Sequence, residues 1–413
     1  MDSSKLSLFL PSLEGGGAER VFVELSKQFV ALGCSVDLVL ASAHGPYRNE
    51  VPADVRMIDL GASGVLASLP SLVRYLRTER PQVMLSGLDH ANIIGLLACA
   101  ISRTRTRCVI SVRCVPTAMY REDRSVRGFS TLQLMKLLYR FADGIIGNSA
   151  AVAADLSRSF GVAPSRITTI LNPIDVDRVT RESLIRLSHP WANAAGTPII
   201  LSVGSLTVVK DFLTLVRAFS IIRQRRDCRL VILGEGPERP PLERLIRDLG
   251  VQADVHLPGF VSNPFSWMKC AAVFVSSSLT EGCPNALMQA LACGTAVVST
   301  DCVGGSAEVL QGGKWGRLVP VRNPGAMAAG ILATMDSASR PDVRQRASEF
   351  AIDRVARQYL ECLIPGYLPA ALVPGTPAGG MPGAEEGAAG CGLPALTAIR
   401  MPHTSQKSSL AES

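Results

Sequence analysis

Short apolar segments alternate with helical segments along most of this 413-residue chain, and this alternation constrains its fold most strongly. Continuous apolar strands joined by amphipathic helices are typical of parallel β-sheets with helices on both faces. In the first half, helices are expected at 18–32 and 149–160, ended by Gly33 and Gly161. The strands expected there are 6–10, 35–40, 55–59, 82–86, 108–112, 144–148 and 167–171.

A second run of the same pattern follows a break at Asn172-Pro173 and a polar stretch at 188–197. We therefore predict two doubly wound α/β domains, residues 1–187 and 188–363, which face each other across a cleft. Ligands are expected there, beyond the carboxyl ends of the strands. The expected strands of the second domain are 199–203, 229–233, 255–257, 273–276 and 296–299, and its expected helices include 211–225, 241–249 and a final one at 342–363.

Residues 364–413 are rich in Pro, Gly, Ala and Ser, which predicts a disordered tail.

The cysteines, the apolar runs and the N-terminal residues together predict a cytosolic protein. Eleven scattered cysteines without a Cys-x-x-Cys pair predict reduced thiols, and we expect no metal site. The longest apolar run, 91–101, is about half of the ~20 residues that a membrane span requires. The N-terminus is expected to be a first strand and not a secretory signal.

Basic and apolar residues are interleaved between positions 103 and 140. Nine Lys or Arg residues stand there against Glu122 and Asp123, with Met, Tyr, Phe and Leu between them. This pattern predicts a surface for anionic lipid headgroups or a lipid diphosphate. A solvated basic face is the plain alternative. Nucleic acid is a further one, which we disfavour because no pattern of a nucleic-acid fold accompanies the basic residues.

Residues 278–308 carry the most specific signal. A turn at Thr280-Glu281-Gly282-Cys283-Pro284 leads into a helix expected at 285–292, and a strand and the loop Gly304-Gly305 follow before Glu308. Backbone N–H groups at a helix start suit a phosphate or a sugar oxygen. The alternative is an ordinary crossover between two strands.

This segment resembles the donor-binding signature of the retaining, nucleotide-sugar-dependent glycosyltransferases of family four. Their pattern is E-G-x-P-N, a second Glu eight positions after the first, and A-x-A-C-G-x-P-V-V. The second Glu is replaced here by Gln289. The resemblance implies the GT-B fold, with the active site in the cleft and the last helix packed back across it. The matching residues are Glu281, Gly282, Pro284, Asn285, Ala290, Cys293, Gly294, Val297 and Val298.

Two further loops resemble the family's loops. The stretch Gly15–Arg20 is similar to its G-G-A-E-R loop, which implies that Gly16, Gly17 and Arg20 contact the transferred sugar and the donor diphosphate; a tight structural turn is the alternative. The stretch Gly204–Lys210 is similar to G-R-L-x-x-x-K, whose Arg and Lys neutralise the diphosphate. Lys210 is in place, but Ser205 stands where the family has Arg. Arg20 or Arg113 is expected to supply part of that charge.

The resemblance assigns the remaining site residues. Gly234 and Gly236 would lie near the nucleotide and Val261 near the base, although both loops are equally well read as turns. Glu281 would bind sugar hydroxyls, Gln289 the ribose, and Glu308 is a further site residue. Many relatives carry a catalytic His where this chain has Arg113. Asp89 and His90 are alternative bases, a structural His90 is equally compatible, and the leaving phosphate can itself take the acceptor proton.

We therefore predict a retaining hexosyltransferase with Glu281, Lys210 and Arg113 as catalytic residues. It would move a hexose or N-acetylhexosamine from a nucleotide-diphosphate sugar, a UDP-sugar in preference to a GDP-sugar, without metal or cofactor. The expected acceptor is a polyprenyl-diphosphate-linked glycan of surface polysaccharide or glycoprotein assembly, at the inner face of the cytoplasmic membrane, with no nucleic-acid partner. A nucleotide-sugar epimerase and a catalytically inactive scaffold are the alternatives.

Overall fold

The computed structural model describes residues 4–367 apart from 15, 123–124, 194–195 and 340. The expected tail therefore lies, from residue 368 on, outside the described residues.

The first sheet contains seven parallel strands in the described part of the chain, in the order β3-β2-β1-β4-β5-β6-β7. Leu6 of the central strand pairs with Val36 on one side and with Val83 on the other. These strands confirm the alternation expected from the sequence. Their bounds are β1 (Lys5–Leu10), β2 (Ser35–Leu40), β3 (Arg56–Asp59), β4 (Val83–Gly87), β5 (Arg107–Val112), β6 (Gly144–Gly147) and β7 (Ile167–Thr169).

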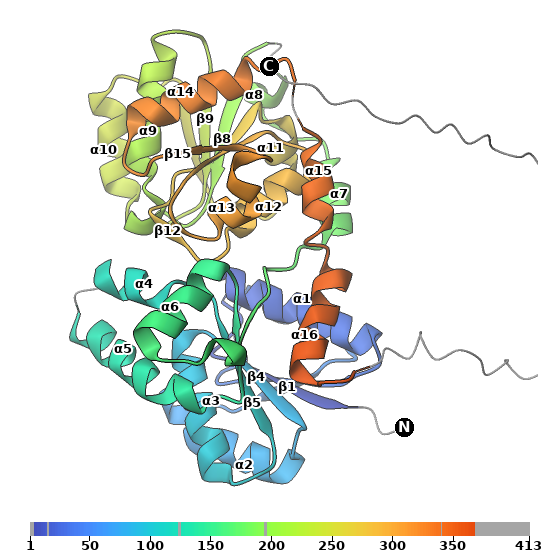
Figure 1. The fold of residues 1–413 in the computed structure, drawn as a ribbon. Helices are drawn as coiled ribbons and strands as arrows, with labels where there is room; N and C mark the ends of the chain where they lie inside the picture. Colours follow the sequence, from blue (N-terminus) through green and yellow to red (C-terminus); the bar gives the residue numbers. More distant parts are fainter. Residues whose placement is uncertain (1–3, 15, 123–124, 194–195, 340, 368–413) are drawn as a thin grey trace, which may run out of the picture. The chain divides into compact units, whose positions relative to one another are not determined.

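Helices cover both faces of this sheet because its strands carry apolar side chains on both faces (Figure 1). Leu6, Leu8 and Leu10 face α1, whereas Phe9 faces the core under α2 and α3. Helix α6 begins where Ser149 accepts a hydrogen bond from Val152 N and ends at Gly161, as expected. The helices are α1 (Gly17–Ala31), α2 (Leu69–Glu79), α3 (Asp89–Ser102), α4 (Pro116–Glu122), α5 (Val126–Leu138) and α6 (Ala150–Phe160).

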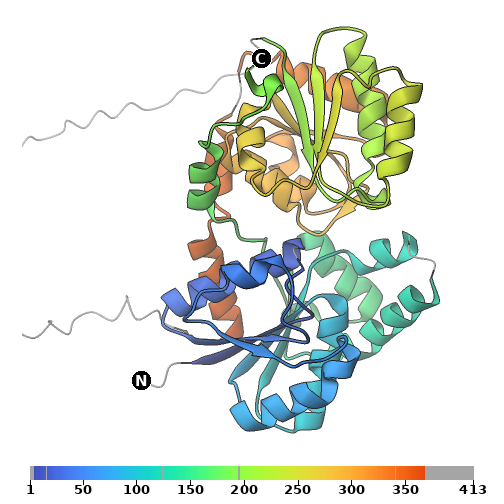
Figure 2. The same cartoon turned by 180° about the vertical axis from the view of Figure 1, so that it is seen from behind.

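The second sheet has six parallel strands in the described residues, in the order β10-β9-β8-β11-β13-β15, and Figure 2 shows it from behind. The expected strand positions are confirmed, but β15 and α14 were not predicted. The strands are β8 (Ile199–Val203), β9 (Arg229–Leu233), β10 (Val255–Gly259), β11 (Val273–Ser276), β13 (Val297–Thr300) and β15 (Arg317–Val319). The helices are α9 (Phe212–Arg223), α10 (Arg239–Asp248), α11 (Phe265–Cys270), α12 (Asn285–Ala292), α13 (Ser306–Val309) and α14 (Pro324–Met335).

Two segments join the sheets. The first contains α7 (Val176–Ser183) and α8 (Pro190–Asn193), and the second contains α15 (Val343–Ser348) and α16 (Ile352–Leu363). The single helix expected at 342–363 is thus wrong. The chain breaks between α15 and α16, where Ile174 N donates to Phe350 O (2.8 Å) and Ile352 N donates to Ile174 O (2.9 Å). Helix α16 then packs on α1, in the core of the first sheet, as the resemblance implied.

Candidate active site

A pocket lies at the carboxyl ends of β8 and β11, beside the start of α12. Lys210 and Glu281 are its charged lining residues, and Lys210 Nζ lies 2.5 Å from Glu281 Oε1. Parallel strands of an α/β sheet bind ligands at this edge. The lining consists of Ser202, Val203, Lys210, Phe212, Phe274, Ser276, Ser277, Ser278, Glu281, Pro284, Asn285, Ala286 and Leu287.

Glu281 is held by a short two-stranded ladder. β12 (Thr280–Glu281) pairs with β14 (Val303–Gly304), and Glu281 lies opposite Gly304. Gly304 has a φ of +137°, and a Cβ there would lie 1.5 Å from the Glu281 carbonyl oxygen. Ser278 Oγ also donates to Glu281 Oε1 at 2.7 Å. The Gly-Gly loop that the sequence singled out therefore supports the backbone of Glu281.

Lys210 ends a 3-10 turn, Val208–Lys210, that follows β8. Its carbonyl accepts a hydrogen bond from Ser277 Oγ at 2.7 Å, which ties the turn to the end of β11. Its aliphatic stem passes Gly204, where a Cβ would lie 3.5 Å from Lys210 Cε. The next residue, Asp211, caps α9: its Oδ1 accepts from Thr214 N at 3.3 Å, and its Oδ2 accepts from Thr214 Oγ1 at 2.7 Å. Local capping thus fixes the point from which Lys210 enters the pocket.

Three glycine-containing loops pack against each other beside this pocket. Gly234 N donates to Gly259 O at 2.8 Å, and Leu206 N donates to Glu235 O at 2.8 Å. A Cβ at Gly234 would lie 2.0 Å from Gly204 O, and one at Gly236 would lie 2.4 Å from Leu206 O. This packing explains why both positions are glycine. A contact of Gly234 and Gly236 with a donor stays a prediction.

Val261, Ser205 and Gln289 do not line the pocket. Val261 packs against the core that lies under α11 and α12, and it follows Phe260, whose side chain is 76% exposed. Ser205 is exposed, and Gln289 is half-buried on α12. Their expected contacts with the donor therefore stay predictions.

Arg113 approaches the E-G-C-P-N turn through its backbone. A Cβ on Gly282 would lie 1.9 Å from Arg113 O, so this position also requires glycine. The Arg113 guanidinium donates to Asn172 Oδ1 at 2.7 Å, and Asn172 Nδ2 donates to Asn285 Oδ1 at 2.6 Å. Arg113 therefore acts on the site through two asparagines.

The role of Asn172 was not predicted from the sequence, where Asn172-Pro173 marks a break in the pattern. An asparagine directly after a strand and before Pro173 was the available signal. Asn285 also reaches the glycine-rich loop, because its Nδ2 donates to Gly17 O at 3.5 Å. Asn172 and Asn285 thus bring the loop after β1 and the turn before α12 together.

Glu19 is a second residue that was missed. It lies in the first turn of α1, and a Cβ on Gly16 would lie 2.3 Å from Glu19 Oε2. Burial raises the pKa of the Glu19 carboxyl, which a backbone hydrogen bond and the charge of Arg113 only partly oppose. A carboxyl with a raised pKa between the glycine-rich loop and Arg113 is a candidate acid or base.

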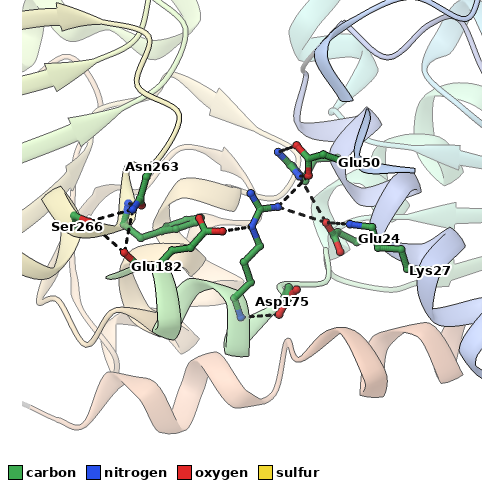
Figure 3. A network of polar contacts seen from close by, with 10 residues as sticks. Glu24, Lys27, Glu50, Asp175, Glu182, Asn263 and Ser266 are labelled. Atoms are coloured by element: carbon green, nitrogen blue, oxygen red, sulfur yellow. Dashed lines mark hydrogen bonds and ion pairs between the residues drawn. The ribbon is translucent and has the colours of Figure 1, made fainter. Parts of the chain in front are cut away.

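Arg20 does not line the pocket. Its guanidinium donates to Glu50 Oε1 at 2.9 Å and lies 4.0 Å from the centre of the Tyr47 ring. Arg178 of α7 shares Glu50, at 3.2 Å from its Oε2, and bonds Glu182 (Figure 3). Both carboxylate oxygens of Glu50 hold Arg20, and its expected contribution of charge near Ser205 stays a prediction.

Asp89 and Glu308 serve structural contacts. The Asp89 carboxylate accepts from Tyr120 of α4 at 3.0 Å and from Tyr139 at 3.4 Å, and burial raises its pKa. His90 is exposed. Glu308 Oε2 accepts from Ala150 N at 2.8 Å, at the start of α6, where an acidic side chain is favoured. Neither Asp89 nor Glu308 lines the pocket.

Comparison with known proteins agrees with this architecture. Residues 15–178 match the family model described as Glycosyltransferase Family 4, and residues 197–337 match the one described as Glycosyl transferases group 1. The fold and its pocket define a glycosyltransferase of the GT-B class. The chain belongs to glycosyltransferase family four, as its donor signature implied.

Two relatives and one solved structure illustrate the likeness. A Campylobacter jejuni N-acetylgalactosamine-N,N'-diacetylbacillosaminyl-diphospho-undecaprenol 4-alpha-N-acetylgalactosaminyltransferase is 31% identical over 87% of this chain and 99% of its own length. The Rhizobium meliloti lipopolysaccharide core biosynthesis glycosyltransferase LpsE is 25% identical over 83% of this chain and 93% of its own length. The fold is similar to that of Anabaena HepE in complex with UDP and glucose, with a TM-score of 0.73, 18% identity, and coverage of 87% of this chain and 99% of that one.

Proposed function

We propose that this glycosyltransferase moves a hexose or N-acetylhexosamine, with retention, from a nucleotide-diphosphate sugar to a polyprenyl-diphosphate-linked glycan. The product would enter surface polysaccharide or glycoprotein assembly. The observation that carries the donor half of the proposal is the pocket with Lys210 and Glu281. The acceptor half is supported by the likeness, over 87% of this chain, to an enzyme whose name specifies a diphospho-undecaprenol acceptor.

The two charged pocket residues suit the two parts of such a donor. The Lys210 ammonium would offset the negative charge that builds up on the leaving diphosphate. The Glu281 carboxylate would accept hydrogen bonds from sugar hydroxyls. The fixed cation takes the role that a metal ion plays in other transferases, and we propose metal-free transfer from a UDP-sugar in preference to a GDP-sugar.

Among the described residues that line the pocket, none is a histidine. An arginine guanidinium carries hydrogen-bond donors and no acceptor, so Arg113 does not suit the role of a base. We propose that it positions the E-G-C-P-N turn through Asn172 and Asn285. The leaving phosphate would then take the acceptor proton, with Glu19 as the alternative proton acceptor.

We further propose that helix α5 lies on an anionic membrane surface. Exposed apolar side chains follow one face of α5 and the short turn after it, and the exposed Arg103, Arg105 and Arg140 lie in the same stretch of sequence. A face of this kind suits the boundary between headgroups and acyl chains. The exposed apolar residues are Val126 (84%), Phe129 (63%), Leu134 (45%), Leu137 (51%) and Phe141 (66%).

The basic stretch does not form one face. Arg107 donates to the Cys362 carbonyl, and Arg113 belongs to the active site. The side chains of Arg121, Arg124 and Arg127 lie outside the described residues. Among the helices that the structure describes, none has the length and apolar character to span a bilayer.

A transfer assay tests the donor and the acceptor together. Purified protein would be incubated with UDP-, GDP- and ADP-sugars and with a membrane extract that contains polyprenyl-diphosphate-linked glycans. The expected result is nucleotide release that depends on the extract, on a UDP-sugar and not on metal, so that EDTA leaves the rate unchanged. Release of free sugar without extract would favour an epimerase, and nucleotide binding without any release would favour a scaffold. No observation at present favours either.

Flotation with liposomes tests the membrane surface. The wild type should float with anionic liposomes, less so at high salt, and not with neutral ones. Replacing Phe129 and Leu137 together by Ser should abolish flotation, because both side chains are exposed and apolar. Replacing the exposed apolar Leu184 and Ile185, outside α5, by Ser is the matched control and should leave flotation unchanged. Equal binding of the wild type to both kinds of liposome, or to neither, contradicts the proposal that α5 binds an anionic membrane.

A further inference from the structure

The charged groups of the pocket neutralise each other. Lys210 and Glu281 are the charged residues among those that line it, and they form an ion pair with an N–O distance of 2.5 Å. A nucleotide sugar would need both groups, the ammonium for its diphosphate and the carboxylate for its hydroxyls. Donor binding therefore requires that this pair be broken.

The two partners are held with unequal firmness. Glu281 is fixed by the β12–β14 ladder and by the hydrogen bond from Ser278 Oγ to the same oxygen that meets Lys210. The Lys210 ammonium lies at the end of a flexible four-carbon stem, which rests against Gly204. An anion in the pocket would therefore draw the ammonium away while the carboxylate stays in place.

We propose that this ion pair makes the pocket select an intact nucleotide sugar over the nucleoside diphosphate product. The proposal rests on the function proposed above. When the nucleotide sugar binds, its diphosphate takes Lys210 and its hydroxyls replace the ammonium at Glu281, so both charged groups keep partners. When only the nucleoside diphosphate is present, Glu281 loses its cation and gains no hydroxyl.

The low exposure of the Glu281 side chain makes the loss of its cation unfavourable. Its side chain is 12% exposed, against 28% for Lys210, so water compensates the carboxylate poorly. An enclosed carboxylate that has lost its cation and keeps only the Ser278 hydroxyl is unfavourable. The ion pair between Lys210 and Glu281 therefore competes with the product diphosphate once the sugar has left. Glu281 thus serves the departure of the nucleotide as well as the binding of the sugar.

Binding calorimetry on Glu281→Gln tests this exchange of partners, in which the donor replaces the ion pair between Lys210 and Glu281. Gln keeps the hydrogen-bonding shape and removes the charge that competes for Lys210. We expect UDP to bind the variant at least tenfold more tightly than the wild type, while UDP-N-acetylgalactosamine gains nothing. If the protein prefers a guanine nucleotide, the same two titrations are made with GDP and GDP-mannose. Glu243→Gln, which removes an exposed carboxylate on α10, is the charge-matched control and should change neither affinity.

A double-mutant cycle separates the ion pair from a general effect of charge. Lys210→Met should weaken binding of both UDP and the nucleotide sugar. On that background Glu281→Gln should bring no gain for UDP, because the cation for which Glu281 and the diphosphate compete is already gone. Glu281→Ala offers the same measurement if Glu281→Gln folds poorly, as thermal unfolding would reveal.

The outcomes distinguish this inference from the proposed function. An affinity for the nucleoside diphosphate that is unchanged or weaker in Glu281→Gln and in Glu281→Ala overturns the exchange, even when the wild type transfers sugar normally. A gain that persists in the Lys210→Met background overturns it as well. A wild type that binds no nucleotide and releases none with any donor overturns the proposed function itself, and the exchange with it.

Discussion

Glycines set how closely the loops around Lys210 and Glu281 can approach each other. Gly282 admits the Arg113 carbonyl, Gly304 admits the Glu281 carbonyl, and Gly234 admits Gly204. In each place a methyl group would overlap a backbone atom, which no side-chain rotation relieves. The sequence displayed these glycines, and the resemblance assigned Gly234 and Gly282 to ligand contact. The structure gives each of them a packing reason that holds without a ligand.

Removing either charged residue of the pocket should abolish most of the activity. Glu281→Ala and Lys210→Ala are each expected to lower turnover by about 100-fold or more, because each removes an electrostatic contact with the reacting sugar or the leaving group. Initial rates of nucleotide release, with the fold checked by circular dichroism, measure the effect. Glu243→Ala is the control. Near wild-type rates in both variants would show that the chemistry occurs elsewhere.

Restoring the family's arginine should strengthen donor binding. Ser205 is exposed at the loop after β8, and Ser205→Arg adds a cation beside the diphosphate that Lys210 is expected to meet. We expect the donor KM to fall about tenfold or more, the equivalent of a charge-assisted hydrogen bond of roughly 1.5–3 kcal/mol, with a smaller change in kcat. Steady-state kinetics measure both, and Ser205→Gln controls for side-chain length. A change confined to kcat would contradict the assigned position of the diphosphate.

At the scale of elements, the register of the first sheet assembles a charged cluster at one end. Asp37 of β2 lies opposite Arg56 of β3, and Arg56 Nε donates to Asp37 Oδ1 at 2.8 Å. Lys5 of β1 lies 3.6 Å from Asp37, and both cations reach Glu79 at the end of α2. Three strands and a helix are thus joined by one set of ion pairs.

This cluster should make the first sheet sensitive to acid. Hydrogen bonds from Arg56 and Lys5 lower the pKa of Glu79 from 4.5 to about 2. The pKa of Asp37 is lowered as well: its burial opposes the shift, and its bonds to Arg56 and Tyr75 outweigh burial. A carboxyl whose pKa is lower in the folded state than in the unfolded state stabilises the fold at pH values above its unfolded pKa. This stabilisation is lost as the pH falls through its folded pKa. Stability from this cluster should therefore decline between about pH 4.5 and pH 2.

Urea unfolding at several pH values measures this decline. Glu79→Gln should unfold at lower urea than the wild type at pH 7, with a difference that shrinks toward pH 2. Because Glu79 is partly exposed, salt should reduce the effect. Glu243→Gln is again the control. A difference between Glu79→Gln and the wild type that does not depend on pH would rule out a linkage to this carboxyl.

The elements that the sequence failed to predict share a physical cause. β15 has three residues, too few for an alternation to appear, and its position is set by pairing with β13. Helix α14 is built from Pro, Gly, Ala and apolar residues without a polar face, so no helical period marks it. The break between α15 and α16 comes from the hydrogen bonds of Ile174 with Phe350 and Ile352, which are distant in sequence. The strands and the donor signature were predictable because local pattern determines them, whereas the contacts of Asn172 and Arg20 depend on tertiary structure.

At the scale of the whole molecule, the chain leaves the first sheet, builds the second and returns. Arg178 and Glu182 of α7 connect the outgoing segment to α1 through Glu50 and Glu24, and the Glu182 carbonyl accepts from Asn263 and Ser266 beside α11 (Figure 3). The returning α16 places six buried side chains in or beside the core of the first sheet. Stability of the first sheet therefore depends on residues more than 300 positions away from α1.

Tyr359 of α16 offers a paired test of this dependence. Its side chain is fully buried, and its hydroxyl has no hydrogen-bond partner among the described residues. Tyr359→Ala should lower the free energy of unfolding by about 3–5 kcal/mol. Tyr359→Phe removes only the unpaired hydroxyl and should raise that free energy by up to about 1 kcal/mol, or leave it unchanged. Urea unfolding measures both. Loss of stability in Tyr359→Phe would reveal a polar partner for the hydroxyl.

The return of α16 has a consequence for synthesis on the ribosome. All seven strands of the first sheet emerge long before α16, which begins at residue 352, whereas α1 ends at residue 31. At about 5–20 residues per second, the roughly 180 residues between the end of β7 at Thr169 and the start of α16 take about 9–36 s to translate. During that interval the nascent first domain has an uncovered apolar strip beside α1, and chaperones bind surfaces of this kind. A chain that stops before α16 is therefore expected to be held or degraded, so that only finished molecules persist in the cell.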